Sequence, residues 1–167
     1  LTWADWSDEV QAVSAALVDA GIESQSRVAI LSATRREWLA IDLAVQSTAA
    51  ITVGIYDTHT AQQCAFILKH SGTRLLFVED SDQLYKVRSV WSDLPDLDRV
   101  ILLEQAPELE GPKVQSYADF VSRGQELVSE EEDHFASRVA GIQPDMLAAI
   151  AYTSGTTGNP KGVMLSH

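Results

Sequence analysis

The sequence has little cysteine and little positive charge. Its single cysteine, Cys64, excludes an internal disulfide and is typical of a reducing compartment. Lys and Arg number 12 against 24 Asp and Glu, which gives a formal net charge of −12. This balance argues against a nucleic-acid surface, because such a surface needs a basic stripe. The uncharged run 43–56 has 14 residues and contains Gln, Ser and Thr, so it is too short and too polar to span a bilayer.

From these features we expect a cytoplasmic protein. Contact with a membrane surface stays open, although no basic amphipathic helix supports it. The sequence begins at Leu1 rather than Met, so a targeting signal cannot be judged. It stops at His167, directly after its most motif-rich segment, and we interpret it as part of a longer protein. Cys64 lies in an apolar helical pattern and is interpreted as a core thiol.

Strand-like apolar runs alternate with helical patterns along the first two thirds of the chain. The strand-like runs are 28–32, 50–56, 74–79 and 99–103, and the helical segments between them are 37–48, 61–70 and 82–91. Alternation with short turns predicts an α/β fold with a parallel sheet and right-handed crossovers. The runs are apolar throughout rather than alternating, which indicates helices on both faces of the sheet.

The chain is predicted to have three parts. Residues 1–105 form the alternating lobe and begin with a helix, residues 106–145 are a connecting loop with helices, and residues 146–167 are a strand and a binding loop. The acidic run 130–133 is interpreted as the first turn of a helix, which favours acidic side chains, rather than as a metal site. We therefore expect no metal ligand in this sequence.

The segment 152–167 is the strongest functional signal. The candidate phosphate-binding residues are Thr153, Ser154, Gly155, Thr156, Thr157, Gly158 and Lys161. Glycines permit close backbone approach, and consecutive backbone N–H groups can form a nest for an anion. The hydroxyls add donors and the lysine adds a positive charge, so the set suits a polyphosphate. The loop follows an apolar segment read as a buried strand, where open α/β sheets bind ligands.

Two common phosphate-binding patterns do not fit this loop. A P-loop counted from Gly155 fails, because Pro160 stands in place of the second glycine and Gly162 in place of the Ser or Thr. The Rossmann fingerprint fails because its third glycine is missing in register. A plain Gly/Ser/Thr linker does not explain the Pro-Lys-Gly sequence or the preceding strand.

Residues 152–163 match every specified position of Tyr/Phe-Thr-Ser-Gly-Ser/Thr-Thr-Gly-x-Pro-Lys-Gly-Val. The segment therefore resembles the signature loop of the adenylate-forming (AMP-binding) superfamily, which includes acyl-CoA synthetases, peptide-synthetase adenylation domains and luciferases. Leu1-Thr2-Trp3 and the segment around Trp38 are similar to the N-terminal region of that family. Residues 54–58 look closest to long-chain fatty acyl-CoA synthetases of the bubblegum-like branch.

The resemblance implies a two-step reaction. A fatty acid and ATP give an acyl-adenylate and pyrophosphate, and coenzyme A then takes the acyl group. Lys161 would be catalytic, and the loop would grip the β- and γ-phosphates, with Gly155 and Gly158 letting the backbone close. The Mg²⁺ ligand, the adenine- and ribose-binding segments and the C-terminal catalytic lysine of the family would lie outside this sequence, so the piece alone would be inactive. A helix is expected to begin near His167.

Two alternatives stay open. The sequence is compatible with a non-catalytic nucleotide-binding or interaction module that retains the loop. It is also compatible with an adenylating enzyme that passes the acyl group to a carrier protein.

Overall fold

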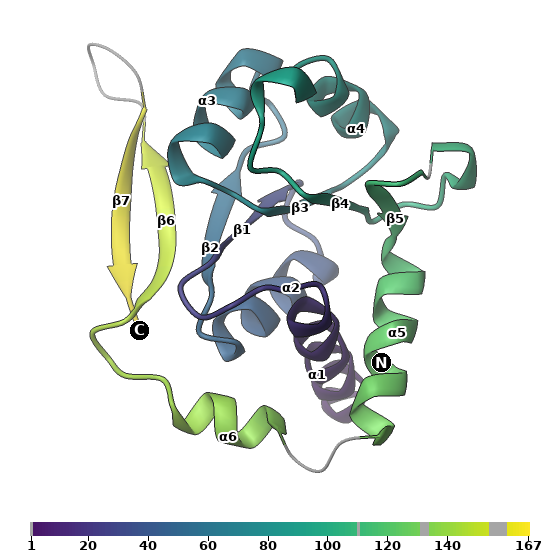
Figure 1. The fold of residues 1–167 in the computed structure, drawn as a ribbon, viewed down its shortest axis with the longest axis vertical. Coiled ribbons are helices and arrows are strands. Elements are labelled where there is room, and N and C mark those ends of the chain that lie inside the picture. Colours follow the sequence, from purple (N-terminus) through teal and green to yellow (C-terminus); the bar gives the residue numbers. More distant parts are fainter. Residues whose placement is uncertain (1, 110, 131–133, 154–159) are drawn as a thin grey trace.

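The computed structural model describes residues 2–109, 111–130, 134–153 and 160–167. In this part of the chain the strands form one seven-stranded sheet with the order β5-β4-β3-β1-β2-β6-β7, flanked by helices (Figure 1). The strands are β1 Arg27–Leu31, β2 Ile51–Ile55, β3 Leu75–Val78, β4 Arg99–Leu102, β5 Val114–Ser116, β6 Leu147–Thr153 and β7 Lys161–Ser166. The α-helices are α1 Trp3–Asp19, α2 Arg36–Ser47, α3 Ala61–Ser71, α4 Ser81–Arg88, α5 Tyr117–Glu130 and α6 His134–Ala140. Short 3₁₀ helices span Trp91–Asp93 and Pro107–Leu109.

The order of the strands decides which face each helix covers. Neighbouring strands from β5 to β6 are parallel, and only β7 runs antiparallel, against β6. The chain moves from β1 to β2, then passes back across β1 to reach β3 and β4. With right-handed crossovers this reversal puts α3 and α4 on the face opposite α2, whereas the return from β5 to β6 puts α5 on the α2 side. Figure 1 shows this arrangement, and it confirms the predicted α/β fold.

Both faces of the sheet are buried in apolar clusters. Along β1, Ala29 and Leu31 belong to the cluster on the α3/α4 side, whereas Val28 and Ile30 belong to the cluster on the α1/α2/α5 side. All four are fully buried, because successive side chains of a strand point to opposite faces. This double burial explains why residues 28–31 of β1 are apolar without alternation.

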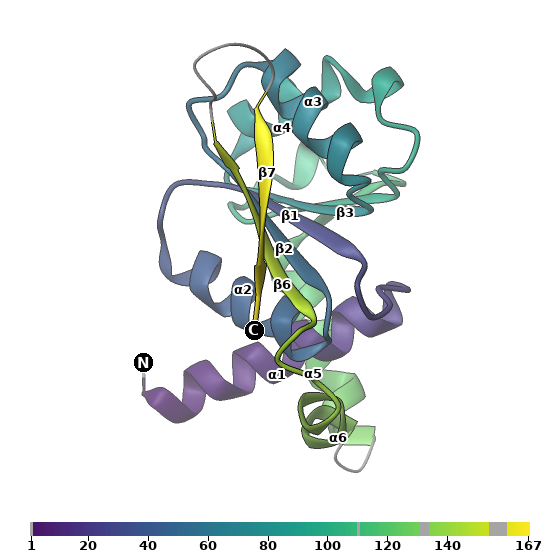
Figure 2. The same cartoon turned by 90° about the vertical axis from the view of Figure 1, so that its left-hand side faces the viewer.

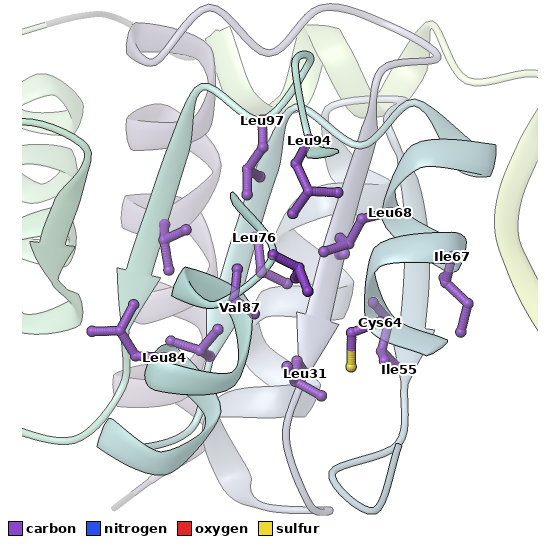
Figure 3. Packing of buried hydrophobic residues seen from close by; sticks show 14 of the residues in the cluster. Leu31, Ile55, Cys64, Ile67, Leu68, Leu76, Leu84, Val87, Leu94 and Leu97 are labelled. Carbon is purple, nitrogen blue, oxygen red and sulfur yellow. The ribbon is translucent and has the colours of Figure 1, made fainter. Parts of the chain in front are cut away.

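Cys64 lies inside the α3/α4 cluster, as predicted. Figure 3 shows its sulfur among apolar side chains, and Leu31 and Ile55 belong to the same cluster. The side chain is fully buried, and this burial raises the pKa of the thiol. Cys64 is therefore a packing residue.

Side-chain caps fix the ends of two important helices. The Thr2 hydroxyl accepts a hydrogen bond from the Asp5 backbone N–H at 3.2 Å, and the Asp5 carboxylate accepts one from the Thr2 N–H at 2.7 Å. This capping box starts α1 at Trp3. Thr60 and Gln63 cap α3 in the same reciprocal way. The helix ends at Gly72, whose φ of 64° is left-handed.

Two strands were not predicted from the sequence. β5 is a three-residue edge strand next to β4, and β7 forms a hairpin with β6 in a segment that had been predicted as part of the binding loop. Short apolar runs do not distinguish a strand from a helix by periodicity, and pairing with a neighbour decides the outcome.

The interpretation of the acidic run 130–133 as the first turn of a helix is wrong at Glu130, the one residue of the run that the structure describes. Glu130 is the last residue of α5. Residues 131–133 lie outside the described residues.

Several large apolar side chains are exposed, among them Trp3 at 83% and Leu39 and Leu43 on α2. β6, expected to be buried, is buried only at Ala148 and Tyr152, and its residues Ala151 and Thr153 are exposed. Among the described helices, none is both long and apolar enough to cross a bilayer.

Candidate functional site

The predicted phosphate-binding residues lie at the end of the β6–β7 hairpin. Thr153 ends β6, Lys161 begins β7, and the two are direct partners in the antiparallel ladder. Both are exposed. Ser154, Gly155, Thr156, Thr157 and Gly158 lie outside the described residues. The structure thus brings together the first and last residues of the predicted set, at the carboxyl end of β6.

The side chains of Thr153 and Lys161 face the α2 side of the sheet. Ile150 and Tyr152 pack into the cluster on the α3 side, so Ala149, Ala151 and Thr153 point to the opposite face. Directly opposed residues of an antiparallel pair share a face, which places Lys161 with Thr153. A hydroxyl and an ammonium group therefore stand on one face at the carboxyl edge.

A cavity of about 500 Å³ opens on this same face. It lies between α2 and strands β2 and β6, and it extends to the turns that follow β1 and β2. Its lining includes Trp38, Asp42, Thr52, Gly54, Ala149 and Ala151. The strand residues in this group have small side chains and sit in register, with Thr52 beside Ala149 and Gly54 beside Ala151. The missing side-chain volume is what creates the cavity.

The polar wall of the cavity is negative rather than positive. The Asp42 carboxylate accepts a hydrogen bond from the Gln46 side-chain amide at 2.9 Å, and both residues line the cavity. A polyphosphate is disfavoured next to a carboxylate. The positively charged residue of the predicted set, Lys161, lies away from Asp42, at the carboxyl end of β6.

An ionic network holds the turn after β1, which forms part of the cavity rim. Glu79 accepts a hydrogen bond from the Ala33 backbone N–H at 2.8 Å, and Arg35 bridges Glu79 at 3.5 Å and Glu104 at 3.3 Å. The hydrogen bond that Arg35 donates to the Glu37 carboxylate is the main cause that raises the pKa of Arg35. These contacts tie the residues after β1, β3 and β4 together, so the rim is fixed by several strands at once.

The turn after β2 is held from α4. The Lys86 ammonium donates a hydrogen bond to the Asp57 carbonyl oxygen at 2.6 Å, and the Gln83 amide donates to the same oxygen at 3.4 Å. Tyr56, which lines the cavity, stacks on the His59 ring with a centroid distance of 5.5 Å. The turn after β2 is therefore positioned by α4, and the turn after β1 by residues that follow β3 and β4.

The cavity residues were not identified from the sequence. Asp42, Gln46 and Thr52 read as ordinary positions of a helix and a strand, and only the fold places them beside the end of β6. A usable signal was present: the strand segments 50–56 and 146–153 both carry small residues at alternate positions. Adjacent small residues on one sheet face indicate a space that other side chains do not fill.

Comparison with known proteins agrees with this geometry. The family of AMP-binding enzymes matches residues 1–167, and the chain belongs to this family. The long-chain-fatty-acid–CoA ligase ACSBG1 of Rattus norvegicus is 34% identical over 146 residues, covering 87% of this chain and 20% of the relative. The long-chain-fatty-acid–CoA ligase FadD15 of Mycobacterium bovis is 31% identical over 166 residues, covering 99% of this chain and 26% of the relative.

Solved structures share the fold. The anthranilate CoA ligase AuaEII, determined with anthranoyl-AMP, superposes with a TM-score of 0.84 at 25% identity, covering 99% of this chain and 30% of that one. The adenylation domain of a carboxylate reductase from Mycobacterium chelonae has a TM-score of 0.81 at 21% identity, with coverage of 99% and 27%. The predicted resemblance to adenylate-forming enzymes is confirmed, and relatives are long-chain fatty acid–CoA ligases. The chain spans about a fifth to a quarter of the length of the ligases ACSBG1 and FadD15.

Proposed function

We propose that this chain is the N-terminal part of an ATP-dependent long-chain fatty acid–CoA ligase and supplies the loop that holds the departing pyrophosphate. One observation carries the proposal: Thr153 and Lys161, the first and last of the predicted phosphate-binding residues, are paired on one sheet face at the carboxyl edge. The family membership and the fatty-acid-activating relatives support the substrate class.

The proposed reaction has two group transfers. A carboxylate oxygen of the fatty acid forms a bond to the α-phosphorus of ATP, and the bond from that phosphorus to the bridging oxygen breaks, releasing pyrophosphate. The sulfur of coenzyme A then attacks the acyl carbon, and AMP leaves. Negative charge grows on the leaving pyrophosphate in the first step, so preorganised donors there lower the barrier.

Lys161 is the proposed catalytic residue of this chain, and Thr153 to Gly158 are the proposed phosphate-binding residues. A charge-assisted hydrogen bond from the Lys161 ammonium to the leaving oxygens would contribute roughly 1.5–3 kcal/mol. ATP, the fatty acid and coenzyme A are the proposed small-molecule substrates.

Mg²⁺ is proposed to neutralise phosphate charge during the reaction. In the described ranges, no group of three or more His, Cys, Asp or Glu side chains could hold a metal ion. The carboxylate that would bind the ion is therefore proposed to lie elsewhere in the protein, and this chain contributes donors to the phosphates.

The test of this function is acid-dependent ATP–pyrophosphate exchange by the full-length ligase with a series of fatty acids. We expect exchange that requires a long-chain fatty acid, followed by acyl-CoA formation when coenzyme A is added. Absence of exchange with every fatty acid would contradict the proposal and favour a non-catalytic nucleotide-binding module. Exchange without acyl-CoA formation would indicate another acceptor, such as a carrier protein.

The role of Lys161 has a matched control on the same chain. We expect Lys161→Ala to lower the exchange rate about ten- to hundredfold, which corresponds to the loss of one charge-assisted contact. Lys69→Ala removes another exposed lysine, on the last turn of α3, and should leave the rate within about twofold. Equal rates for the two variants would remove Lys161 from the mechanism.

A further inference from the structure

Tyr152, the residue before Thr153, is anchored on the opposite face of the sheet from the proposed phosphate site. Its side chain is 9% exposed and packs in the α3/α4 cluster. Because side chains alternate along a strand, the direction of the Tyr152 ring sets the direction of Thr153. Figures 1 and 2 show the loop end of the hairpin next to α3. Whatever holds the Tyr152 ring therefore also orients the end of β6.

His70, on the last turn of α3, supplies that hold. Its Nδ1 and the Tyr152 Oη share a hydrogen bond of 2.8 Å. The two rings also meet edge to face, with centroids 5.8 Å apart and an interplanar angle of 83°. On its own helix, His70 stacks on Phe66 at 5.4 Å and 18°. The imidazole ring is thus in contact with an aromatic ring on α3 and with one on β6.

The same contact reaches the second strand of the hairpin. Gly162 is the ladder partner of Tyr152, and a Cβ on Gly162 would lie 3.3 Å from Tyr152 Cζ and 2.9 Å from Ile150 Cγ2. The ring therefore fills the space that the glycine leaves open. Because Gly162 follows Lys161, holding Tyr152 places the residues at both described ends of the hairpin loop.

We propose that His70 is a positioning residue for adenylation, which acts through Tyr152 to orient Thr153 and Lys161 toward the phosphates. The inference rests on the proposed ligase function. In this role His70 touches no substrate. It fixes the strand ends from the face of the sheet opposite the proposed phosphate site. α3 is suited to this, since Thr60 caps its start and Gly72 ends it in a left-handed conformation.

The test uses the full-length ligase and three variants: Tyr152→Phe, His70→Phe and the double variant. Tyr152→Phe removes one oxygen, and His70→Phe keeps an aromatic ring without the hydrogen bond. We expect each single variant to raise the KM for ATP in the exchange assay about three- to fivefold, as the loss of one neutral hydrogen bond implies. The KM for the fatty acid should stay within about twofold.

The double variant tests whether the two residues act as one unit. If they share a single interaction, the KM for ATP in the double variant equals that of either single variant. His70→Asn, which can keep a polar atom near the position of Nδ1, should recover part of the loss seen in His70→Phe. A purely structural role would lower kcat through loss of folded enzyme and leave the KM for ATP unchanged. An unchanged KM for ATP in both single variants, or effects that multiply, would overturn the proposal.

Controls separate this inference from the proposed function. Tyr85→Phe removes the hydroxyl of a 54%-exposed tyrosine on α4 and should behave as wild type. If the wild-type ligase shows no exchange, the proposed function fails, and ATP binding by calorimetry then tests the positioning role alone: a Kd raised about threefold by Tyr152→Phe supports it, and an equal Kd contradicts it. If His70→Phe does not fold, as judged by its urea midpoint, Tyr152→Phe and His70→Asn decide the question.

Discussion

Tyr152 and Gly162 lie opposite each other in the β6–β7 ladder, and the tyrosine ring occupies the space next to the glycine. A Cβ at position 162 would approach Tyr152 Cζ to 3.3 Å and Ile150 Cγ2 to 2.9 Å. The glycine after the lysine of the signature motif is thus required by packing against the strand before the loop, in addition to any role in the loop itself.

Gly162→Ala is expected to disturb the proposed site more than the fold. The added methyl group must displace the Tyr152 ring or the Ile150 side chain, and either movement shifts the end of β6. We expect ATP–pyrophosphate exchange by the full-length ligase to fall about tenfold, while the free energy of unfolding falls by about 1 kcal/mol. The measurements are exchange kinetics and urea denaturation. Exchange equal to that of the wild type would show that the ring contact is not needed.

Gly124→Ala is expected to destabilise the fold strongly. Gly124 on α5 packs against α1 so closely that a Cβ would lie 1.8 Å from the Ala12 carbonyl oxygen. Backbone cannot yield as a flexible side chain does, so the helices must separate, and we expect a loss of about 1–3 kcal/mol in urea denaturation. Gly111→Ala is the matched control, because a Cβ there meets no atom within 4 Å. Similar unfolding midpoints for the two variants would contradict this packing.

Tyr117 is expected to make the fold less stable at alkaline pH. Its hydroxyl donates a 2.8 Å hydrogen bond to Glu9, and burial, followed by the Glu9 charge, raises the pKa of Tyr117 far above its ordinary value. The folded state keeps this proton at a pH where the unfolded state, with a pKa of about 10, releases it. The stabilisation is therefore complete below about pH 10 and is lost above it, by about 1.4 kcal/mol per pH unit.

The measurement is the free energy of unfolding of the wild type and Tyr117→Phe from pH 9 to 11.5. The variant lacks the titrating hydroxyl, so its stability should fall less steeply above pH 10. The buried phenol of Tyr152, whose pKa is also raised by burial, adds a separate contribution of the same sign in both proteins. Parallel pH profiles for the wild type and the variant would rule out Tyr117 as the source of the slope.

Cys64 is expected to resist thiol reagents in the native protein. It is fully buried, and burial raises the pKa of its thiol, so little reactive thiolate is present or accessible. Labelling with a chromogenic disulfide reagent should proceed only as fast as the protein opens, and should become rapid in denaturing urea. Rapid labelling of the native protein would contradict the placement of Cys64 in the α3/α4 cluster.

The sequence was sufficient to predict the α/β fold with helices on both faces. Residues 28–31 are apolar at every position because both sheet faces are covered, and such a run can be recognised in the local sequence. The signature motif was likewise complete in residues 152–163, since its glycines, hydroxyls and lysine are contiguous. These features depend on neighbours along the chain, so they could be predicted without tertiary contacts.

Tertiary structure decided those features of the fold and the site that depend on residues far apart in the sequence. The segment 161–166 is a strand because β6 offers it a free edge, and its own short apolar run does not determine that outcome. The cavity beside Asp42 exists because small residues on two strands, nearly 100 positions apart in the sequence, lie in register, as Thr52 and Ala149 do. The motif by itself determined which residues suit a phosphate, whereas only the fold determined that Thr153 and Lys161 share a face and that His70 is hydrogen-bonded to Tyr152, the neighbour of Thr153 on β6.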